Sequence, residues 1–547
     1  MNRFKRQPSW VKRHTRSKSS STHSIKNLFS ANKGAAKKQA PASTLGSSTY
    51  SDGNPSSVTY EPVTMIDRGA REIFGHSSLR GRQKEIMTAL LRGRDVAVVM
   101  PTGGGKSLCF QLPACLSKGV AIVISPLLAL IEDQLNSLLR APCGGVPAAA
   151  LSSSTPPEEV RAILSELRKC ERGEEPVIKL LYLTPERVTM DSRLLDILDG
   201  LKRNGCLSMV VIDECHCISA WGHCFRKEYG QLGKLKDRFR VPTIALTATA
   251  TRRVLVDCIS SLHLENPKVV EAGFDRPNLR FSVKPKAKEK IKQYKQVHEI
   301  IKEQNRLAGH PVSGIVYCYA KADTEALCDY LVDQDIRADY YHAGISQALR
   351  ESNQARWSRG EIDVVCATIA YGMGIDRASV RYVVHATMPK SIEGYYQEAG
   401  RAGRDGKRAE CVLFYRKEDI SKVKFLITGT RGKRLKNNAA KSRELRSLEQ
   451  MKEFCENKKK CRRALLAEHF GVEVPQCTVK CDTCGSGSGS GSSSSTSGGG
   501  AASSSSSSNS SSSGRGKGKR KAGSLGHAQE QTHPSVSSSA EEVIDLC

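Results

Sequence analysis

The sequence lacks any long apolar run. Its longest runs, such as VAVVM at 96–100, are far too short to cross a bilayer, so we expect no contact with a membrane interior. The sequence also lacks an N-terminal segment that joins a basic start to an apolar stretch, and we therefore expect no secretion. The 19 cysteines are an odd number. In a reducing compartment they indicate core residues or metal ligands rather than disulfides.

Negative charge is scarce, above all near the N-terminus. Residues 1–51 contain no Asp or Glu but eleven Lys or Arg, and the whole chain has 84 Lys+Arg against 56 Asp+Glu, a net charge of +28. Such an excess favours a polyanionic partner, usually nucleic acid and sometimes an acidic membrane face. The basic N-terminal tail accounts for part of the excess.

Short apolar runs alternate with longer mixed segments, which is typical of parallel strands buried on both faces and joined by crossover helices. This pattern predicts a doubly wound α/β fold with two sheets, separated near FDRPN at 274–278. Eight runs carry the prediction: 96–100, 120–125, 209–213, 243–247, 314–319, 363–368, 382–386 and 411–415. We expect a disordered basic arm over 1–58, sheet domains over 59–272 and 273–417, a helical module over 418–484 and a disordered Ser/Gly-rich tail over 485–547.

A glycine-rich segment, PTGGGKS at 101–107, follows the first apolar run; we call it the phosphate loop. Its glycines allow backbone N–H groups to surround phosphate oxygens, and the next helix adds its positive end. Lys106 would contact the β- and γ-phosphates of ATP and Ser107 would hold Mg²⁺. Met100 stands where the strict motif requires a further glycine. The segment Thr102, Gly103, Gly104 and Gly105 would line the nucleotide.

Two adjacent carboxylates, Asp213 and Glu214, follow the apolar run at 209–213. Ligands of open α/β sheets bind at the carboxyl edge, where this strand would end. Asp213 would hold Mg²⁺, and Glu214 would act as general base toward the attacking water. Such a pair by itself is typical of a solvated strand end, but about a hundred residues after a phosphate loop it indicates nucleotide hydrolysis.

From Phe74 to Cys484 the sequence resembles the RecQ helicases of superfamily two. The resemblance rests on FGHSSLRGRQKEI (74–86), PTGGGKSLCFQLPA, SPLLALIEDQ (125–134), LYLTPER (181–187), DECH (213–216), ISAWGHCFRKEY (218–229), ALTATAT (245–251), FDRPNLRF (274–281) and YYQEAGRAGRDG (395–406). It implies two RecA-like domains with ATP between them. Gln83 would read adenine with Arg80 nearby, and Gly374 and Asp376 of ATIAYGMGID would contribute to the nucleotide site.

The resemblance also implies that Gln397, Arg401 and Arg404 of the second domain act on the γ-phosphoryl group. Such arginines accelerate hydrolysis by about 10³–10⁵. An arginine pair at this spacing is more commonly a surface pair, but here it follows a second α/β sheet.

Single-stranded DNA would cross the tops of both sheets. Ser125 and Thr247 would meet phosphates with little sequence preference, and Arg226 would contact a further phosphate. Trp221 and Phe225 would stack on bases, unless Trp221 is a core residue. Three residues depart from the family: Cys215 replaces an alanine, Lys227 a proline and Cys224 an aspartate. We hypothesise that Cys224 loosens the coupling between DNA and hydrolysis; comparing the ATPase of Cys224→Asp with and without single strands tests this.

The last motif is a group of four cysteines, Cys461, Cys477, Cys481 and Cys484. Four thiolates satisfy tetrahedral Zn²⁺, whereas unliganded core cysteines are the alternative. The gap between Cys477 and Cys481 resembles that of the fifth-type metazoan RecQ paralogue and some plant relatives. Cys455 is expected to be free, and the alternative is that it substitutes for one of the four ligands.

Many RecQ proteins continue into a winged helix, but here a Ser/Gly tract follows Cys484. The resemblance implies a 3′-to-5′ DNA helicase of repair, recombination and replication, acting on single-stranded, forked or recombination intermediates. The alternatives are a DNA-stimulated ATPase that translocates or anneals strands but unwinds weakly, and an inactive scaffold, against which the intact motifs argue.

The tails suggest a location and a partner. GRGKGKRK at 514–521 resembles a nuclear-import signal or a DNA-binding patch, with a solvated charge run as the alternative. The acid-free N-terminal arm also fits an organelle transit peptide. EEVIDLC at the C-terminus resembles a SUMO-interacting motif, in which an extended segment would pair with a sheet edge. Its core would be Val543, Ile544, Asp545 and Leu546 after two glutamates.

Overall fold

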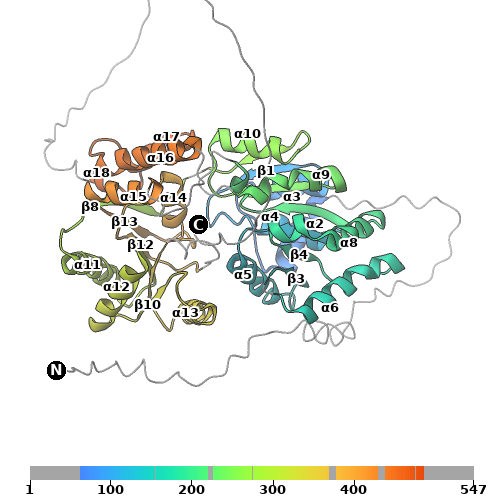
Figure 1. Ribbon diagram of the computed structural model, residues 1–547, viewed down its shortest axis with the longest axis horizontal. Helices are drawn as coiled ribbons and strands as arrows, with labels where there is room; N and C mark the ends of the chain where they lie inside the picture. Colours follow the sequence, from blue (N-terminus) through green and yellow to red (C-terminus); the bar gives the residue numbers. More distant parts are fainter. Residues whose placement is uncertain are drawn as a thin grey trace, which may run out of the picture. The chain divides into compact units, whose positions relative to one another are not determined.

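The computed structural model describes residues 62–153, 155–219, 226–273, 275–368, 377–428, 438–474 and 476–485. These residues form two parallel sheets followed by a helical module (Figure 1). The prediction of an α/β fold with two sheets is therefore confirmed. Within the described residues no helix is long and apolar enough to cross a membrane.

The first sheet has seven parallel strands in the order β3-β4-β2-β5-β6-β1-β7. Its strands are β1 Val96–Val99, β2 Val120–Ile124, β3 Ala148–Leu151, β4 Leu180–Leu183, β5 Leu207–Ile212, β6 Thr243–Thr247 and β7 Lys268–Glu271. Its helices are α2 Pro62–Glu72, α3 Gln83–Leu91, α4 Leu108–Leu116, α5 Leu128–Leu139, α6 Pro157–Leu167, α7 Pro185–Met190, α8 Ser192–Arg203, α9 Gly233–Phe239 and α10 Arg252–Ser261, with 3₁₀ helices η2 Arg168–Arg172, η3 Cys215–Ile218 and η4 Lys227–Gln231.

The second sheet has six parallel strands in the order β10-β11-β9-β12-β13-β8. Its strands are β8 Leu279–Pro285, β9 Gly314–Tyr317, β10 Ala338–Tyr341, β11 Val364–Ala367, β12 Tyr382–His385 and β13 Ala409–Tyr415. Its helices are α11 Lys290–Ala308, α12 Lys321–Asp333, α13 Gln347–Arg359 and α14 Ile392–Ala399.

Alternation of side chains along the strands divides each core into two layers. In β1, Ala97 and Val99 pack into one cluster, whereas Val96 and Val98 pack into the cluster on the opposite face. All four are at most 2% exposed. Helices cover both faces of a parallel sheet, which is why the central strands consist of continuous apolar residues.

The helical module packs against the second sheet. Its helices are α15 Glu418–Thr428, α16 Asn438–Glu456, α17 Arg462–Phe470 and α18 Asp482–Gly485. α17 and α18 contact β8, and α14 contacts α16 and α17, so these elements lie side by side in Figure 1. The module therefore shares a core with the second sheet, to which Leu448, Met451 and Phe454 of α16 contribute.

Candidate active site and metal centre

The phosphate loop joins the end of β1 to the start of α4, as the sequence pattern predicts. Gly103 and Gly105 have φ of +83°, a left-handed conformation that glycine adopts readily. At Gly104 a Cβ atom would lie 2.6 Å from Met100 Cγ, and at Gly105 it would lie 2.4 Å from Gln83 Nε2. The loop therefore has no room for larger residues at these positions. Its glycine backbone and the adjoining helix start fit a bound phosphate chain.

Lys106 lies with Asp213 and Glu214 at the carboxyl edge of the first sheet. Its Nζ donates to Met100 O at 3.1 Å. Burial lowers the pKa of Lys106, while Glu214 and Asp213 oppose that change. Burial and the neighbouring Glu214 raise the pKa of Asp213 to about 7, against the opposing effect of Lys106. Two adjacent carboxylates with limited compensation from one lysine suit a divalent cation, whose charge favours their ionised forms.

Glu214 is held in an unusual backbone conformation. Its φ and ψ are 48° and 43°, in the left-handed region that residues with a Cβ seldom occupy. Its N–H donates to Asp213 Oδ1 at 2.9 Å, and the Tyr229 hydroxyl donates to Asp213 O at 3.0 Å. Strained backbone persists where surrounding contacts fix it and is concentrated at functional sites. The conformation places both carboxylates at the end of one strand.

His216, which the sequence reasoning left without a role, lies on η3 and links Glu214 to the end of β6. Its Nδ1 lies 2.9 Å from Thr247 Oγ1 and 3.2 Å from Glu214 Oε2. His216 and Thr247 are at most 1% exposed. One imidazole thus touches the candidate general base and a candidate DNA-contacting residue. The signal for it was present in the DECH segment, where it is the last residue.

The second domain reaches the phosphate loop through residues 400–404, which we call the arginine loop. A Cβ placed on Gly103 would lie 3.1 Å from Arg404 Cγ, and a Cβ on Gly400 would lie 3.5 Å from Thr102 Cβ. Arg404 also contributes to lowering the pKa of Lys106. Arg401 is 4% exposed and lies beside Tyr317, whose pKa burial raises to about 12 although Arg401 acts to lower it. The structure therefore brings Arg404 to the predicted ATP site, whereas Arg401 lies beside Tyr317 of β9.

The other residues that the sequence predicts at the nucleotide site differ in exposure and in their contacts. Gln83, on α3, is 2% exposed; its Nε2 donates to Gly105 O at 2.9 Å and its Oε1 accepts from Arg80 N at 2.7 Å. The side chain of Arg80 is exposed. Gln397 is half-buried on α14. Gly374 and Asp376 lie outside the described residues.

The candidate DNA contacts fall at strand ends of the first sheet. Ser125 follows β2 and Thr247 ends β6, and both are buried. Arg226 donates from Nη1 to Pro126 O at 2.9 Å and lies 3.8 Å from Glu186, so its guanidinium is already engaged within the protein. Cys215 is buried, and its carbonyl accepts from Cys258 Sγ at 3.1 Å. Trp221, Cys224 and Phe225 lie outside the described residues.

Two linker residues that the sequence reasoning did not select approach the same site. Arg276 donates to Thr102 O at 2.7 Å and to Gly400 O at 3.1 Å. Asn278 Nδ2 donates to Gly403 O and to Lys407 O, each at 2.8 Å. From the sequence, FDRPN indicated only a boundary between the sheets. Arg276 and Asn278 bind backbone carbonyls, which every residue type supplies, so no sequence motif marks their partners.

The four predicted metal ligands come together in the helical module. The Sγ atoms of Cys461, Cys477, Cys481 and Cys484 all lie within 4.8 Å of one another. The Sγ atoms of Cys481 and Cys461 are 3.7 Å apart. With Zn–S bonds of about 2.3 Å, tetrahedral geometry separates two sulfurs by about 3.8 Å. The cluster therefore fits a zinc ion.

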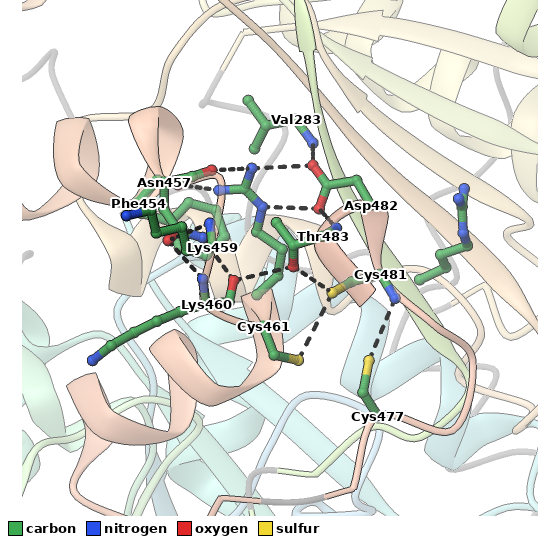
Figure 2. A network of polar contacts seen from close by, with 12 residues as sticks. Val283, Phe454, Asn457, Lys459, Lys460, Cys461, Cys477, Cys481, Asp482 and Thr483 are labelled. Atoms are coloured by element: carbon green, nitrogen blue, oxygen red, sulfur yellow. Dashed lines mark hydrogen bonds and ion pairs between the residues drawn. The ribbon is translucent and has the colours of Figure 1, made fainter. Parts of the chain in front are cut away.

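Hydrogen bonds around the cluster hold the sulfurs in place (Figure 2). Cys481 N donates to Cys477 Sγ at 3.4 Å, and Thr483 Oγ1 lies 3.1 Å from Cys481 Sγ. Burial acts to raise the pKa of Cys481, but Thr483 and nearby N–H groups outweigh it and lower that pKa to about 6. The thiolate form, which zinc requires, is therefore favoured at Cys481. Cys455 is buried in the core of α16, outside the group of four sulfurs.

A buried ion pair attaches the cluster to the second sheet. Arg462 Nε and Nη2 donate to the two oxygens of Asp482 at 2.9 and 3.0 Å, and Asp482 accepts from Val283 N of β8 at 2.9 Å. Figure 2 shows Val283, Asp482 and Cys481 in one network. Arg463 forms an ion pair with Asp275 of the linker. The metal cluster is thus tied to both β8 and the linker.

Three families of known proteins match successive parts of the chain. The DEAD/DEAH box helicase family matches residues 80–257, the helicase conserved C-terminal domain matches 292–406, and the RecQ zinc-binding family matches 417–485. A solved structure of Mycobacterium smegmatis helicase Lhr bound to ssDNA and AMP-PNP is similar in fold, with a TM-score of 0.52 and 18% identity over 72% of this chain and 58% of its own. A structure of Mss116p bound to ssRNA and AMP-PNP gives a TM-score of 0.51 at 18% identity over 71% of this chain and 80% of its own.

Proteins found by sequence comparison have higher identities to this chain than these two structures. ATP-dependent DNA helicase Q-like 2 of Arabidopsis thaliana is 39% identical over 80% of this chain and 60% of its own. RecQ-like DNA helicase BLM of Xenopus laevis is 42% identical over 73% of this chain, but this match covers 28% of that protein. ATP-dependent DNA helicase Q1 of Rattus norvegicus is 39% identical over 76% of this chain and 64% of its own. The chain therefore spans less than two thirds of these relatives, and by its two sheet domains and its zinc-binding module it belongs to the RecQ family of superfamily-two helicases.

Proposed function

We propose that the protein is an ATP-dependent DNA helicase that translocates 3′ to 5′ and acts in repair, recombination and replication. The observation that carries this proposal is the contact of the arginine loop with the phosphate loop, where Arg404 lies against Gly103. An arginine from a second domain can act on a γ-phosphoryl group only while the two domains are closed. Hydrolysis would then change the positions of the two domains relative to each other, and a motor requires such a cycle of closing and opening.

The residues around the phosphate loop would divide the chemistry of ATP hydrolysis. Lys106 would bind the β- and γ-phosphates, while Ser107 and Asp213 would hold Mg²⁺. Glu214 would accept the proton of the attacking water, and its Oε2 lies 3.2 Å from His216 Nδ1. Magnesium would supply charge neutralisation at the phosphates.

Further residues would complete the nucleotide site. Gln83 and Arg80 would read adenine, which requires the Gln83 amide to leave Gly105 O or to share that bond. Arg401 and Arg404, with Gln397, would stabilise charge on the transferred phosphoryl group. Gly374 and Asp376 belong to the same proposal.

DNA would bind along the carboxyl edges of the sheets. Ser125 and Thr247 lie on that edge, and His216 Nδ1 lies 2.9 Å from Thr247 Oγ1 and 3.2 Å from Glu214 Oε2. A strand bound there would therefore act on the catalytic carboxylate through one imidazole. The net charge of +28 favours such a partner. Trp221, Phe225 and Arg226 would contribute stacking and phosphate contact.

Cys461, Cys477, Cys481 and Cys484 would hold one zinc ion that stabilises the module. The sulfur separations support this assignment. Zinc in such a site contributes to folding and takes no part in hydrolysis.

The test compares the wild type with Lys106→Ala in two assays, ATP hydrolysis stimulated by single-stranded DNA and separation of a forked duplex. Lys118→Ala, an exposed lysine after α4, is the matched control. We expect the control to retain both activities and Lys106→Ala to lose both. A wild type with no DNA-stimulated hydrolysis would overturn the proposal.

A second candidate is a DNA-stimulated ATPase that translocates or anneals strands but unwinds poorly. The Ser/Gly tract at 485–513 favours it, because such a composition cannot build the core of a winged helix directly after the zinc module. Displacement of streptavidin from single-stranded DNA without separation of forked duplexes would support this candidate over the first.

We also propose a nuclear location, with an organelle as the alternative, and binding of SUMO or sumoylated proteins through Val543, Ile544, Asp545 and Leu546. Both proposals rest on sequence outside the described residues. Loss of SUMO binding on changing Val543 and Ile544 to Ala would support the second. Imaging of the tagged full chain, with and without residues 514–521, tests the first.

A further inference from the structure

Arg276 occupies the linker between β7 and β8 and uses its whole guanidinium group. A guanidinium has five N–H donors in a fixed planar arrangement. Its Nη1 donates to Thr102 O at 2.7 Å and Gly400 O at 3.1 Å. Nη2 donates to Ala402 O at 2.7 Å and Gly403 O at 2.8 Å, and Nε lies 3.5 Å from Asn278 Oδ1. The five donors therefore face five oxygens within the protein.

Because all of its N–H donors face oxygens of the protein, Arg276 differs from a catalytic arginine, which donates to the phosphate. To donate to a phosphate oxygen, it would have to break one of the bonds that it makes. Four of its five acceptors are backbone carbonyls, and burial lowers the pKa of the guanidinium without a carboxylate in direct contact. Neutral acceptors hold the group by geometry more than by charge.

The five bonds are distributed unequally between the domains. The bond to Thr102 O reaches the phosphate loop of the first domain, whereas three bonds go to the arginine loop of the second. Asn278 supports the same side, since its Nδ2 donates to Gly403 O at 2.8 Å. Opening of the domains would therefore break one bond of Arg276 and leave the others intact.

Arg276 and Arg404 also meet at one point of the phosphate loop. A Cβ on Gly103 would lie 3.4 Å from Arg276 Nη1 and 3.1 Å from Arg404 Cγ. The bond to Thr102 O thus forms in the same place where Arg404 reaches the loop. Formation of the hydrogen bond from Arg276 to Thr102 O would therefore bring Arg404 to the phosphate loop.

We propose that Arg276 is a positioning residue that fixes the arginine loop on the phosphate loop, so that Arg404 is delivered to the γ-phosphoryl group only when the Thr102 bond closes. This inference rests on the proposed hydrolytic function. It assigns the linker a part in catalysis in addition to joining the domains. Lysine cannot replace Arg276 in this role, because one ammonium could take the two acceptors of Nη1 but could not also hold Ala402 O and Gly403 O, which Nη2 binds.

The first experiment measures DNA-stimulated kcat and the affinity for ADP in Arg276→Gln and Arg276→Lys. We expect kcat to fall at least about tenfold in both variants, with ADP affinity within about threefold of wild type, since Arg276 acts after binding. Arg280→Gln is the matched control, because Arg280 lies on β8 and contacts Glu410 and Lys480 O, away from the phosphate loop. Wild-type kcat in Arg276→Gln, or parallel losses of ADP affinity and kcat, would overturn the inference.

A double-mutant cycle with Arg404→Ala tests whether Arg276 affects kcat through Arg404. If Arg276 acts by positioning Arg404, the double variant should have about the same kcat as Arg404→Ala alone. Multiplication of the two single losses would overturn the inference. A thermal unfolding midpoint close to wild type excludes misfolding; if Arg276→Gln fails to fold, Asn278→Ala takes its place in the cycle. Wild-type hydrolysis is measured in parallel, and its absence would count against the proposed function instead.

Discussion

The ion pair between Arg462 and Asp482 gives the clearest test of how the zinc module is held. The side chain of Arg462 is 4% exposed and that of Asp482 is 23% exposed. Asp482→Ala would leave a buried guanidinium with only the carbonyls of Phe454 and Asn457 as acceptors. Removing one partner of a buried pair costs about 3–5 kcal/mol, and partial exposure of Asp482 places the expected cost near the lower limit. The Val283 N–H loses its acceptor as well, which adds about 1 kcal/mol.

The sum, about 4 kcal/mol, is a large part of the stability of a typical domain, about 5–15 kcal/mol. We expect it to appear as reduced hydrogen-exchange protection of the α17 amides and as faster transfer of zinc to a chelator. Glu468→Ala is the control, since the Lys460–Glu468 pair on the same module is 63% and 48% exposed and should contribute less than about 1 kcal/mol. If Asp482→Ala leaves the protection of α17 within about 1 kcal/mol of wild type, the reasoning is wrong.

Three further outcomes are expected. Glu214→Gln should lower DNA-stimulated kcat by about 10²–10⁴-fold with ADP affinity preserved; a kcat within tenfold of wild type in a hydrolysis assay would contradict the role of Glu214 as general base. His216→Ala should reduce the ratio of hydrolysis rates with and without single strands by about tenfold, the equivalent of one hydrogen bond; an unchanged ratio would mean that DNA is sensed elsewhere. Removal of zinc by a chelator should unfold the module before the sheets, because structural zinc contributes about 10–16 kcal/mol; purified protein that lacks stoichiometric zinc yet shows full stability by calorimetry would refute this.

The fold was predictable where the strands are central. All eight apolar runs coincide with strands, and they are continuous because both of their faces are covered. The unrecognised strands include all four sheet edges, β3, β7, β8 and β10. An edge strand such as β7, with sequence KVVE, buries only one of its four residues, so its sequence carries little apolar signal. Inside the first sheet β4 was also missed as a strand, since its Leu-Leu-Tyr-Leu has no β-branched residue.

The sequence predicted those site residues whose side chains would bind a ligand. It did not predict those whose side chains bind backbone carbonyls of the protein. The glycines, Lys106 and the two carboxylates follow one another in recognisable spacing, and the structure gathers them at one edge. Arg276 binds carbonyl oxygens of residues that are more than a hundred positions away, and any residue type supplies such oxygens. Sequence pattern alone therefore could not identify its partners.

The attachment of the zinc module to β8 has a mechanical consequence. Because Asp482 accepts from Val283 N, the module is attached to the second sheet, and the proposed motor would have two moving bodies instead of three. The only described covalent path between those bodies runs from the end of β7 at Glu271 to the start of β8 at Leu279. At about 3.3–3.6 Å per residue, this tether spans at most about 30 Å when fully extended. Pro277 stiffens it further by fixing one backbone angle. Under the proposed function, such a short tether would let the bodies rotate about a hinge while keeping Arg404 near the phosphate loop.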